Sequence, residues 1–256
     1  MNMERFDSII AQTTRLGGKS APRRWAYSDV APWPDSGEFE LVMQRDAAFE
    51  LGGGDRGAVN FTCVTTDETL VGGDEILLWG PDLTELKADT GYIRAALVRV
   101  KDIDGGDDPE AAFRAVQDFD FVKYRVFPRG YMIRTSSESD REQVRVSKQA
   151  VKSGISFARV GADFIRQYKQ NPNVLSVRML FITAPDADHA LAKKLAKSAR
   201  DITMSLSKIM EGLPTDCASC QLKPICDEVA GMKELHFGKN KGQTSRLYFP
   251  ARRAGK

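Results

Sequence analysis

Three cysteines stand close together near the C-terminal end of the sequence, and their spacing is the clearest sign of chemistry in the chain. Cys217, Cys220 and Cys226 form a C-x2-C-x5-C pattern. One tight turn can bring the first two thiolates together, and the next segment adds a third. The fourth cysteine, Cys63, stands alone in "NFTCVTT" and is expected to be an ordinary core residue. The clustering predicts a metal or cluster site within residues 213–238.

A tetrahedral site needs a fourth ligand, and His236 is the candidate. It is one of two histidines and ends the short helical piece "CDEVAGMKELH". The alternative for His236 is an exposed turn residue. The other histidine, His189, falls near the start of a predicted surface helix, where we expect a solvated side chain. Three thiolates and an imidazole suit either an iron–sulfur cubane or a closed structural zinc site, and ligand softness does not separate the two.

The composition indicates a soluble globular protein with a sizeable core. The chain has 256 residues, of which 42 % are hydrophobic and 28 % charged, and 37 Lys and Arg nearly balance 35 Asp and Glu. This balance gives no reason to expect nucleic acid or an anionic membrane as a partner. The N-terminus lacks an apolar run typical of a signal peptide or spanning helix, which predicts a cytoplasmic protein. In that reducing compartment, clustered cysteines favour metal or redox chemistry over disulfides.

The apolar patterning predicts a mixed α and β fold in four regions. Residues 1–37 are expected to form a short amphipathic helix and a proline-rich linker, 38–212 a central α/β domain, 213–238 the cysteine segment, and 239–256 a basic, solvated tail. Strands are expected at 38–44, 59–66, 75–80, 92–100, 121–127, 130–135 and 174–183, and helices at 109–118, twice between 139 and 170, and at 186–212.

Two further motifs are candidates for ligand binding. The glycines of "ELGGGDRG" are candidates to cradle a phosphate with their amides, but they do not open a clear helix, so a tight turn is the preferred interpretation. In "VRVSKQAVKSG", Arg145 and Lys148 are expected near each other on a helix, with Lys152 one turn further. They are candidates to bind the phosphates of a coenzyme A-like ligand, and the alternative is an ordinary solvated face.

Four stretches, in this order, resemble the central domain of the CO-methylating acetyl-CoA synthases. They are "AAFELGGGDRGAVNFT", "GGDEILLWGPDLTEL", "REQVRVSKQAVKSGISFARVGADFIRQYKQ" and "VLSVRMLFIT". That family has a similar FGGG stretch, a strand leading into GPDID, an R-[IV]-S-K-x-A-x-x-K-G-F segment entering a helix, and a long strand after it. The resemblance covers about residues 38–236 and implies an acetyl-CoA synthase-like sheet with helices.

The resemblance also implies a 4Fe-4S cluster at the cysteine segment. In the family a C-x2-C after a helix supplies the first ligands of a cubane that is bridged to a nickel centre. The family's third cysteine follows after a longer gap than the five residues found here, and its fourth thiolate position falls at His236. The sequence stops before the positions of the family's nickel-binding thiolates. We therefore expect no nickel and no acetyl-CoA synthesis by this chain alone.

Two functions of different classes are consistent with these features. The first is an iron–sulfur subunit of a multiprotein one-carbon or acyl-transfer system. It would dock a corrinoid protein or a catalytic subunit, and its cluster would pass electrons or order the docking surface. The second is an assembly module whose zinc only staples the C-terminal segment. An autonomous transferase using the glycine loop and the basic helix is the least favoured, and whether the chain is itself an enzyme is left open.

Overall fold

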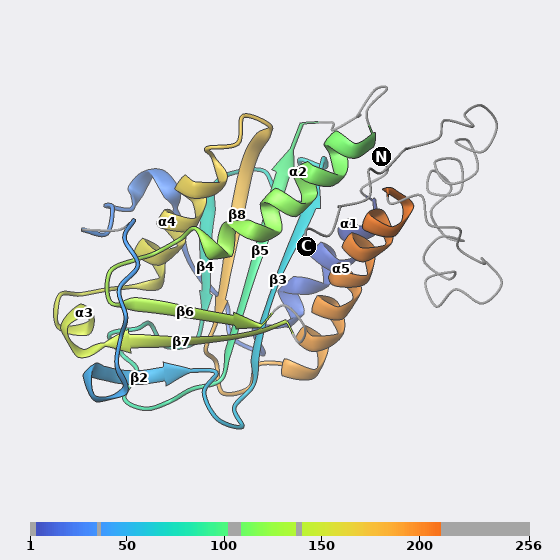
Figure 1. Ribbon diagram of the computed structural model, residues 1–256. Helices are drawn as coiled ribbons and strands as arrows, with labels where there is room; N and C mark the ends of the chain where they lie inside the picture. The colour runs from blue at the N-terminus through green and yellow to red at the C-terminus, as the bar shows by residue number, and fades with distance from the viewer. Residues whose placement is uncertain (1–3, 35–36, 102–108, 137–139, 211–256) are drawn as a thin grey trace, which may run out of the picture.

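The structure is a computed structural model that describes residues 4–34, 37–101, 109–136 and 140–210 (Figure 1). These residues form a five-stranded and a three-stranded sheet with helices packed against them. The predicted mixed α and β class is confirmed. The helices are α1 (Glu4–Gln12), α2 (Pro109–Phe121), α3 (Lys148–Lys152), α4 (Phe157–Tyr168) and α5 (His189–Met210). The strands are β1 (Arg23–Ala26), β2 (Ala47–Leu51), β3 (Ala58–Thr65), β4 (Glu75–Trp79), β5 (Tyr92–Val100), β6 (Tyr131–Ser136), β7 (Arg141–Ser147) and β8 (Val174–Ile182).

The five-stranded sheet has the order β1-β4-β8-β5-β3 and carries most of the core. β4 and β8 are parallel, as are β3 and β5, whereas β5 and β8 are antiparallel. Side chains alternate between the two faces of a strand. Arg94 contacts Phe164 of α4 on one face, and Thr65 donates a hydrogen bond to Asp7 of α1 on the other. Both faces are therefore covered, which explains why β5 and β8 read as nearly continuous apolar runs.

The three-stranded sheet, with the order β2-β7-β6, runs across the strands of the larger one (Figure 1). Asn60 of β3 binds the turn residue just before β7, because its backbone N–H and its side-chain amide both donate to the carbonyl oxygen of Asp140, at 2.8 and 3.0 Å. Buried residues of both sheets belong to one continuous apolar cluster, which includes Phe49, Val144 and Val146 of the smaller sheet. The described residues therefore share a single core.

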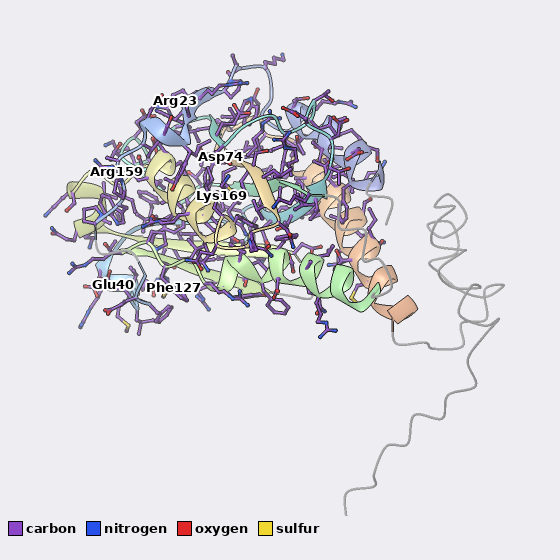
Figure 2. The ribbon with its side chains drawn as sticks, turned by 90° about the horizontal axis from the view of Figure 1, so that it is seen from above. Arg23, Glu40, Asp74, Phe127, Arg159 and Lys169 are labelled. Atoms are coloured by element: carbon purple, nitrogen blue, oxygen red, sulfur yellow. The ribbon has the colours of Figure 1, made fainter. Side chains whose placement is uncertain are left out.

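The strand predicted at 38–44 is wrong, because β2 begins only at Ala47. The segment is held beside the loop before β6 by backbone and carboxylate contacts. The Gly130 N–H donates to Glu40 at 2.7 Å and the Gly37 N–H to the Phe127 carbonyl at 3.0 Å, and Glu40 and Phe127 lie close together in Figure 2. Within this segment Val42 is buried, whereas Phe39, Leu41 and Met43 are exposed.

Three other expectations about local structure are also wrong. The predicted linker contains β1, which pairs antiparallel with β4. The strand expected at 121–127 is the end of α2 followed by a 3-10 turn, Val122–Tyr124. A strand, β7, occupies the start of the region expected to hold only helices. Its alternating burial, with Glu142, Val144 and Val146 inward, is a period of two and therefore a strand pattern. None of the described helices is long and apolar enough to cross a membrane.

Candidate functional site

The four predicted metal ligands lie outside the residues that the structure describes. These are Cys217, Cys220, Cys226 and His236, so their convergence stays a prediction. Among the described residues, no group of three or more His, Cys, Asp or Glu side chains is placed to hold a metal ion. Cys63 is fully buried in β3, and burial raises the pKa of its thiol, so it is the ordinary core residue that the sequence predicts.

The structure does not place Arg145 and Lys148 together on a helix. Arg145 lies in β7, where its Nε donates to Glu50 Oε1 at 2.5 Å. Lys148 opens the short helix α3, and its Nζ donates to the carbonyl oxygen of Arg45 at 2.8 Å. Ser147 lies between the two residues and ends β7. Its side chain accepts a hydrogen bond from the Ala150 N–H and so caps α3. Each cation already has a partner, so a ligand phosphate would have to compete for it.

The glycine loop between β2 and β3 forms a tight turn. Gly52 has a φ of +65°, and a Cβ there would lie 2.4 Å from the Cβ of Ala58. Only glycine fits both the left-handed conformation and this close approach. Arg141 donates to the carbonyl oxygens of Gly52 and Gly54. These contacts agree with the preferred interpretation of a tight turn. Two carbonyl oxygens of the loop face the guanidinium of Arg141.

The G-P-D motif after β4 joins the sheet to α4. Gly80 has a φ of +96°, and a Cβ there would lie 2.4 Å from the backbone nitrogen of Ala184. Asp82 accepts hydrogen bonds from the backbone N–H groups of Leu83 and Phe157, at 2.7 and 2.8 Å, and Phe157 begins α4. Burial raises the pKa of the Asp82 carboxyl group. The motif thus has a packing role: it fixes the start of α4 against the sheet.

A buried ion pair links the two sheets, and sequence reasoning missed it. Arg94 of β5 donates from Nε and Nη2 to the two carboxylate oxygens of Glu142 in β7, at 2.8 and 2.6 Å. Both side chains are 0 % exposed. The guanidinium also lies 4.7 Å from the ring centre of Phe164, and its Nη2 lies 3.4 Å from Asn60 Oδ1. Arg94 Nη1 is buried without a hydrogen-bond partner. The only sequence signal was an arginine inside an otherwise apolar strand.

The tyrosine hydroxyls near this ion pair stay protonated and add no further charge to its surroundings. The hydroxyls of Tyr92 and Tyr131 are 2.8 Å apart. Burial raises the pKa of both, and it raises the pKa of Tyr168 to about 12. Burial alone would lower the pKa of Arg94, but the Glu142 carboxylate reverses this and the pKa of Arg94 is raised. Arg94 therefore stays protonated at any physiological pH, and its hydrogen bonds to Glu142 form a fixed connection between the sheets.

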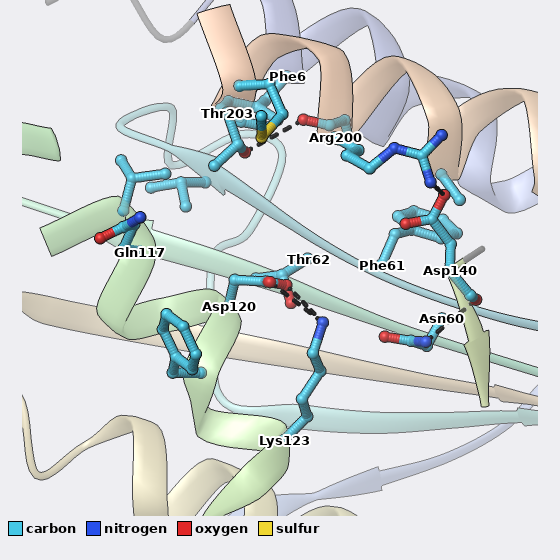
Figure 3. A pocket seen from close by; sticks show the side chains of 16 residues that line it. Phe6, Asn60, Phe61, Thr62, Gln117, Asp120, Lys123, Asp140, Arg200 and Thr203 are labelled. Carbon is cyan, nitrogen blue, oxygen red and sulfur yellow. Dashed lines mark hydrogen bonds and ion pairs between the residues drawn. The ribbon is translucent and has the colours of Figure 1, made fainter. Parts of the chain in front are cut away.

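A cavity of about 210 Å³ lies between α2 and α5, over β3 (Figure 3). Its charged lining residues are paired: Lys123 donates to Asp120 at 3.0 Å, and Arg200 donates to Asp140 at 2.5 Å. Asp140 has a φ of 52°, which is uncommon for a residue other than glycine. Burial raises the pKa of its carboxyl group. The remaining lining is mostly apolar and includes Phe6, Phe61, Val64, Val116, Ala196 and Ala199.

The expectation of a solvated His189 is wrong. The imidazole is half-buried between two glycines, since a Cβ at Gly57 would lie 2.4 Å from Nδ1 and one at Gly91 would lie 2.8 Å from Nε2. Nδ1 is buried without a hydrogen-bond partner. Burial, and secondarily the charge of Lys193, lower the pKa of His189, against a smaller opposing effect of Asp188. The packed form of the ring is therefore the neutral form.

We expect the protein to lose stability as His189 becomes protonated. Because its folded-state pKa is lowered, the contribution of His189 is complete above the unfolded value of about 6.5 and is lost as pH falls below it. The urea concentration at the midpoint of unfolding should decrease when the pH is lowered from 7.5 to 5.5. The decrease should be smaller in His189→Gln. An unchanged pH dependence in His189→Gln would contradict this account.

Comparison with known protein families shows a match over the central part of the chain. Residues 35–187 match the sequence model of a family described as CO dehydrogenase/acetyl-CoA synthase complex beta subunit. The matched range contains the glycine loop, the G-P-D motif, Arg145 and Lys148. The four predicted metal ligands follow it in the sequence. No curated protein matches the chain.

Proposed function

The chain belongs to the CO dehydrogenase/acetyl-CoA synthase complex beta subunit family, whose match covers more than half of its 256 residues, and on this premise we propose that it acts as a subunit of a multiprotein one-carbon or acyl-transfer system. The family description names a complex subunit, which supports other protein subunits as partners. A corrinoid protein or a catalytic subunit suits that role. This family membership is the observation that carries the proposal.

The proposed cofactor is a 4Fe-4S cluster held by Cys217, Cys220, Cys226 and His236. Three cysteines within ten positions, followed by one of the two histidines, offer the donor set that a cubane accepts. The same donors suit zinc, and a zinc-stapled assembly module is the second candidate. If a cluster is bound, it supplies one-electron chemistry or orders the surface that meets the partner. The brown colour of anaerobically purified protein should bleach on reduction, whereas a zinc protein is colourless and redox-silent.

We propose no nickel centre in this chain. The 256 residues contain four cysteines, of which Cys63 is buried in the core and the other three are assigned to the proposed cluster. No thiolate is then left to hold a second metal. Stoichiometric nickel in purified protein, or acetyl-CoA formed by this chain from a methyl donor, CO and CoA, would contradict the proposal.

A coenzyme A-like ligand is a further part of the proposal, with Lys148 as the exposed cation that would meet its phosphates. Arg145 is tied to Glu50 and would contribute only if that ion pair opened. In calorimetry with coenzyme A, Lys148→Glu should weaken binding at least about tenfold, which corresponds to about 1.4 kcal/mol. The melting temperature should hardly change, because exposed charge substitutions usually stay within about 0.5 kcal/mol.

The matched control for this prediction is Lys194→Glu, the same charge reversal at another exposed lysine, on α5. It should leave coenzyme A binding unchanged. Two results would show that Lys148 is an ordinary surface residue. One is equal coenzyme A binding by the wild type and Lys148→Glu, and the other is an equal loss of binding in Lys148→Glu and Lys194→Glu.

A further inference from the structure

The charges that line the cavity between α2 and α5 cancel. Its two cations, Lys123 and Arg200, are ion-paired with its two carboxylates, Asp120 and Asp140. Each pair lies within hydrogen-bond distance, so no lining cation or carboxylate is left to neutralise a charged ligand. A charged ligand would therefore bring an uncompensated charge into a partly buried site, which is unfavourable. The lining favours an uncharged ligand.

Gln117 contributes an unused hydrogen-bonding group to this cavity. In the described part of the chain, its half-buried side-chain amide has no hydrogen-bond partner. Other polar lining groups are already occupied: the Asn60 side chain donates to the Asp140 carbonyl, and the Thr203 hydroxyl donates to the Ala199 carbonyl. Figure 3 shows Gln117 and Asp140 on opposite sides of the cavity. A free amide both donates and accepts, so it can bind a hydroxyl or a carbonyl group.

The rest of the cavity wall is mostly apolar. Phe61 of β3 and Val116 of α2 are 4 % and 3 % exposed, so this part of the wall belongs to the core. Phe121 and Met204 line the same cavity but are 47 % and 49 % exposed, so they mark its open side. Sites for small molecules commonly combine apolar walls with a few placed polar groups.

The size of the cavity limits the ligand to a compact molecule. Its volume of about 210 Å³ corresponds to roughly seven water molecules at the density of the liquid. A single aromatic ring with one substituent fits this volume, whereas a molecule as large as coenzyme A does not. No residue of α3, where Lys148 lies, lines the cavity. The cavity is therefore separate from the coenzyme A-like site proposed above.

We propose that the α2–α5 cavity binds a compact, uncharged ligand with an apolar body about the size of one aromatic ring and one hydroxyl or carbonyl group. The apolar body packs against Phe61 and Val116, and the polar group forms a hydrogen bond with the Gln117 amide. This site goes beyond the proposed function. It consists of described residues alone and does not depend on which metal, if any, the cysteine segment binds.

Titration of the intact chain with phenol tests this site. The methyl groups of the methionines are labelled with ¹³C and observed by NMR. Met204 lines the cavity, whereas Met43 is almost equally exposed, at 47 %, and lies outside it. Phenol should shift the Met204 signal saturably and leave the Met43 signal in place. Absence of a saturable Met204 shift, or equal shifts of both signals, would overturn the proposal.

Two charged probes of similar shape test the requirement for an uncharged ligand. Benzoate and benzylammonium should each bind at least about tenfold more weakly than phenol, because the ion pairs of the lining leave their charge uncompensated. Binding of either ion as tight as that of phenol would overturn the assignment of an uncharged ligand.

Substitutions in the wall test the placement of the ligand. Gln117→Leu removes the amide with little change in volume and should weaken phenol binding about fivefold, the size of a typical net hydrogen bond. Toluene, which has the ring but no hydroxyl, should not bind more weakly to this variant. An equal loss for both probes would show that the Gln117 amide does not bind the polar group.

A second pair of variants tests the cavity itself. Ala199 lines the cavity and is 3 % exposed, so Ala199→Trp should fill the space and abolish the Met204 shift. Ala190→Trp is the matched control, because Ala190 is exposed on the same helix and does not line the cavity. It should bind phenol as the wild type does. Full phenol binding by folded Ala199→Trp would place the ligand elsewhere and refute the proposal.

Discussion

Replacing Cys220 by alanine is expected to abolish metal binding by the cysteine segment. Cys217 and Cys220 are separated by two residues, so a single turn supplies both thiolates, and loss of one leaves too few ligands in reach to hold a cubane. The anaerobically purified variant should be colourless and iron-free, whereas Cys63→Ala should keep the wild-type iron content. Retention of full metal content by Cys220→Ala would remove this residue from the ligand set.

The companion variant His236→Cys is expected to keep the cluster and lower its reduction potential. A thiolate in place of a neutral imidazole adds one negative charge to the ligand set, and this favours the oxidised cluster. In Rieske centres the opposite exchange raises the potential by several hundred millivolts for two histidines, so a shift on the order of 100 mV is expected here. A redox titration measures it. An unchanged potential would show that residue 236 does not bind the cluster.

Removing one partner of the buried pair Arg94–Glu142 is the substitution expected to cost most stability. Glu142→Gln leaves the guanidinium of Arg94 charged and fully buried without its counter-ion. Breaking such a pair costs about 3–5 kcal/mol, a large part of the net stability of a typical domain. Urea unfolding should show a correspondingly lower midpoint, and the loss should appear without any change in metal content.

Two controls distinguish loss of the pair from a general effect of substitution. The double variant Arg94→Met/Glu142→Leu removes both charges and should recover much of the lost stability, because apolar replacement of a buried pair is often close to neutral. Glu68→Gln removes a 78 % exposed carboxylate paired with Arg99 and should cost less than about 1 kcal/mol. If Glu142→Gln were no worse than Glu68→Gln, the pair would have little role in joining the sheets.

The sequence predicted the central strands well because they are buried on both faces. The apolar runs at 59–66, 75–80, 92–100 and 174–183 coincide closely with β3, β4, β5 and β8. Exposed or edge elements were harder. β1, in a proline-rich stretch, has mostly exposed residues and gives no apolar signal. Residues 38–44 have the composition of a strand, but whether such a segment finds a strand partner depends on the whole fold.

The candidate sites were predictable only where the signal is local. The spacing of Cys217, Cys220 and Cys226 is such a signal. The partnership of Arg94 with Glu142 is not, because the residues are 48 positions apart in different sheets. The placement of His189 depends on two glycines from distant loops. The cavity between α2 and α5 likewise arises only when these two helices, far apart in sequence, pack over β3.

Metal analysis of the full chain purified without oxygen is the most direct test of the central claim, that this member of the family carries a cluster on its cysteine segment. Iron, acid-labile sulfide, zinc and nickel are measured per chain on the same sample. We predict about four irons and about four sulfides per chain, as a 4Fe-4S cluster requires, with no stoichiometric zinc or nickel. About one zinc per chain with neither iron nor sulfide would contradict the claim and favour the zinc-stapled assembly module.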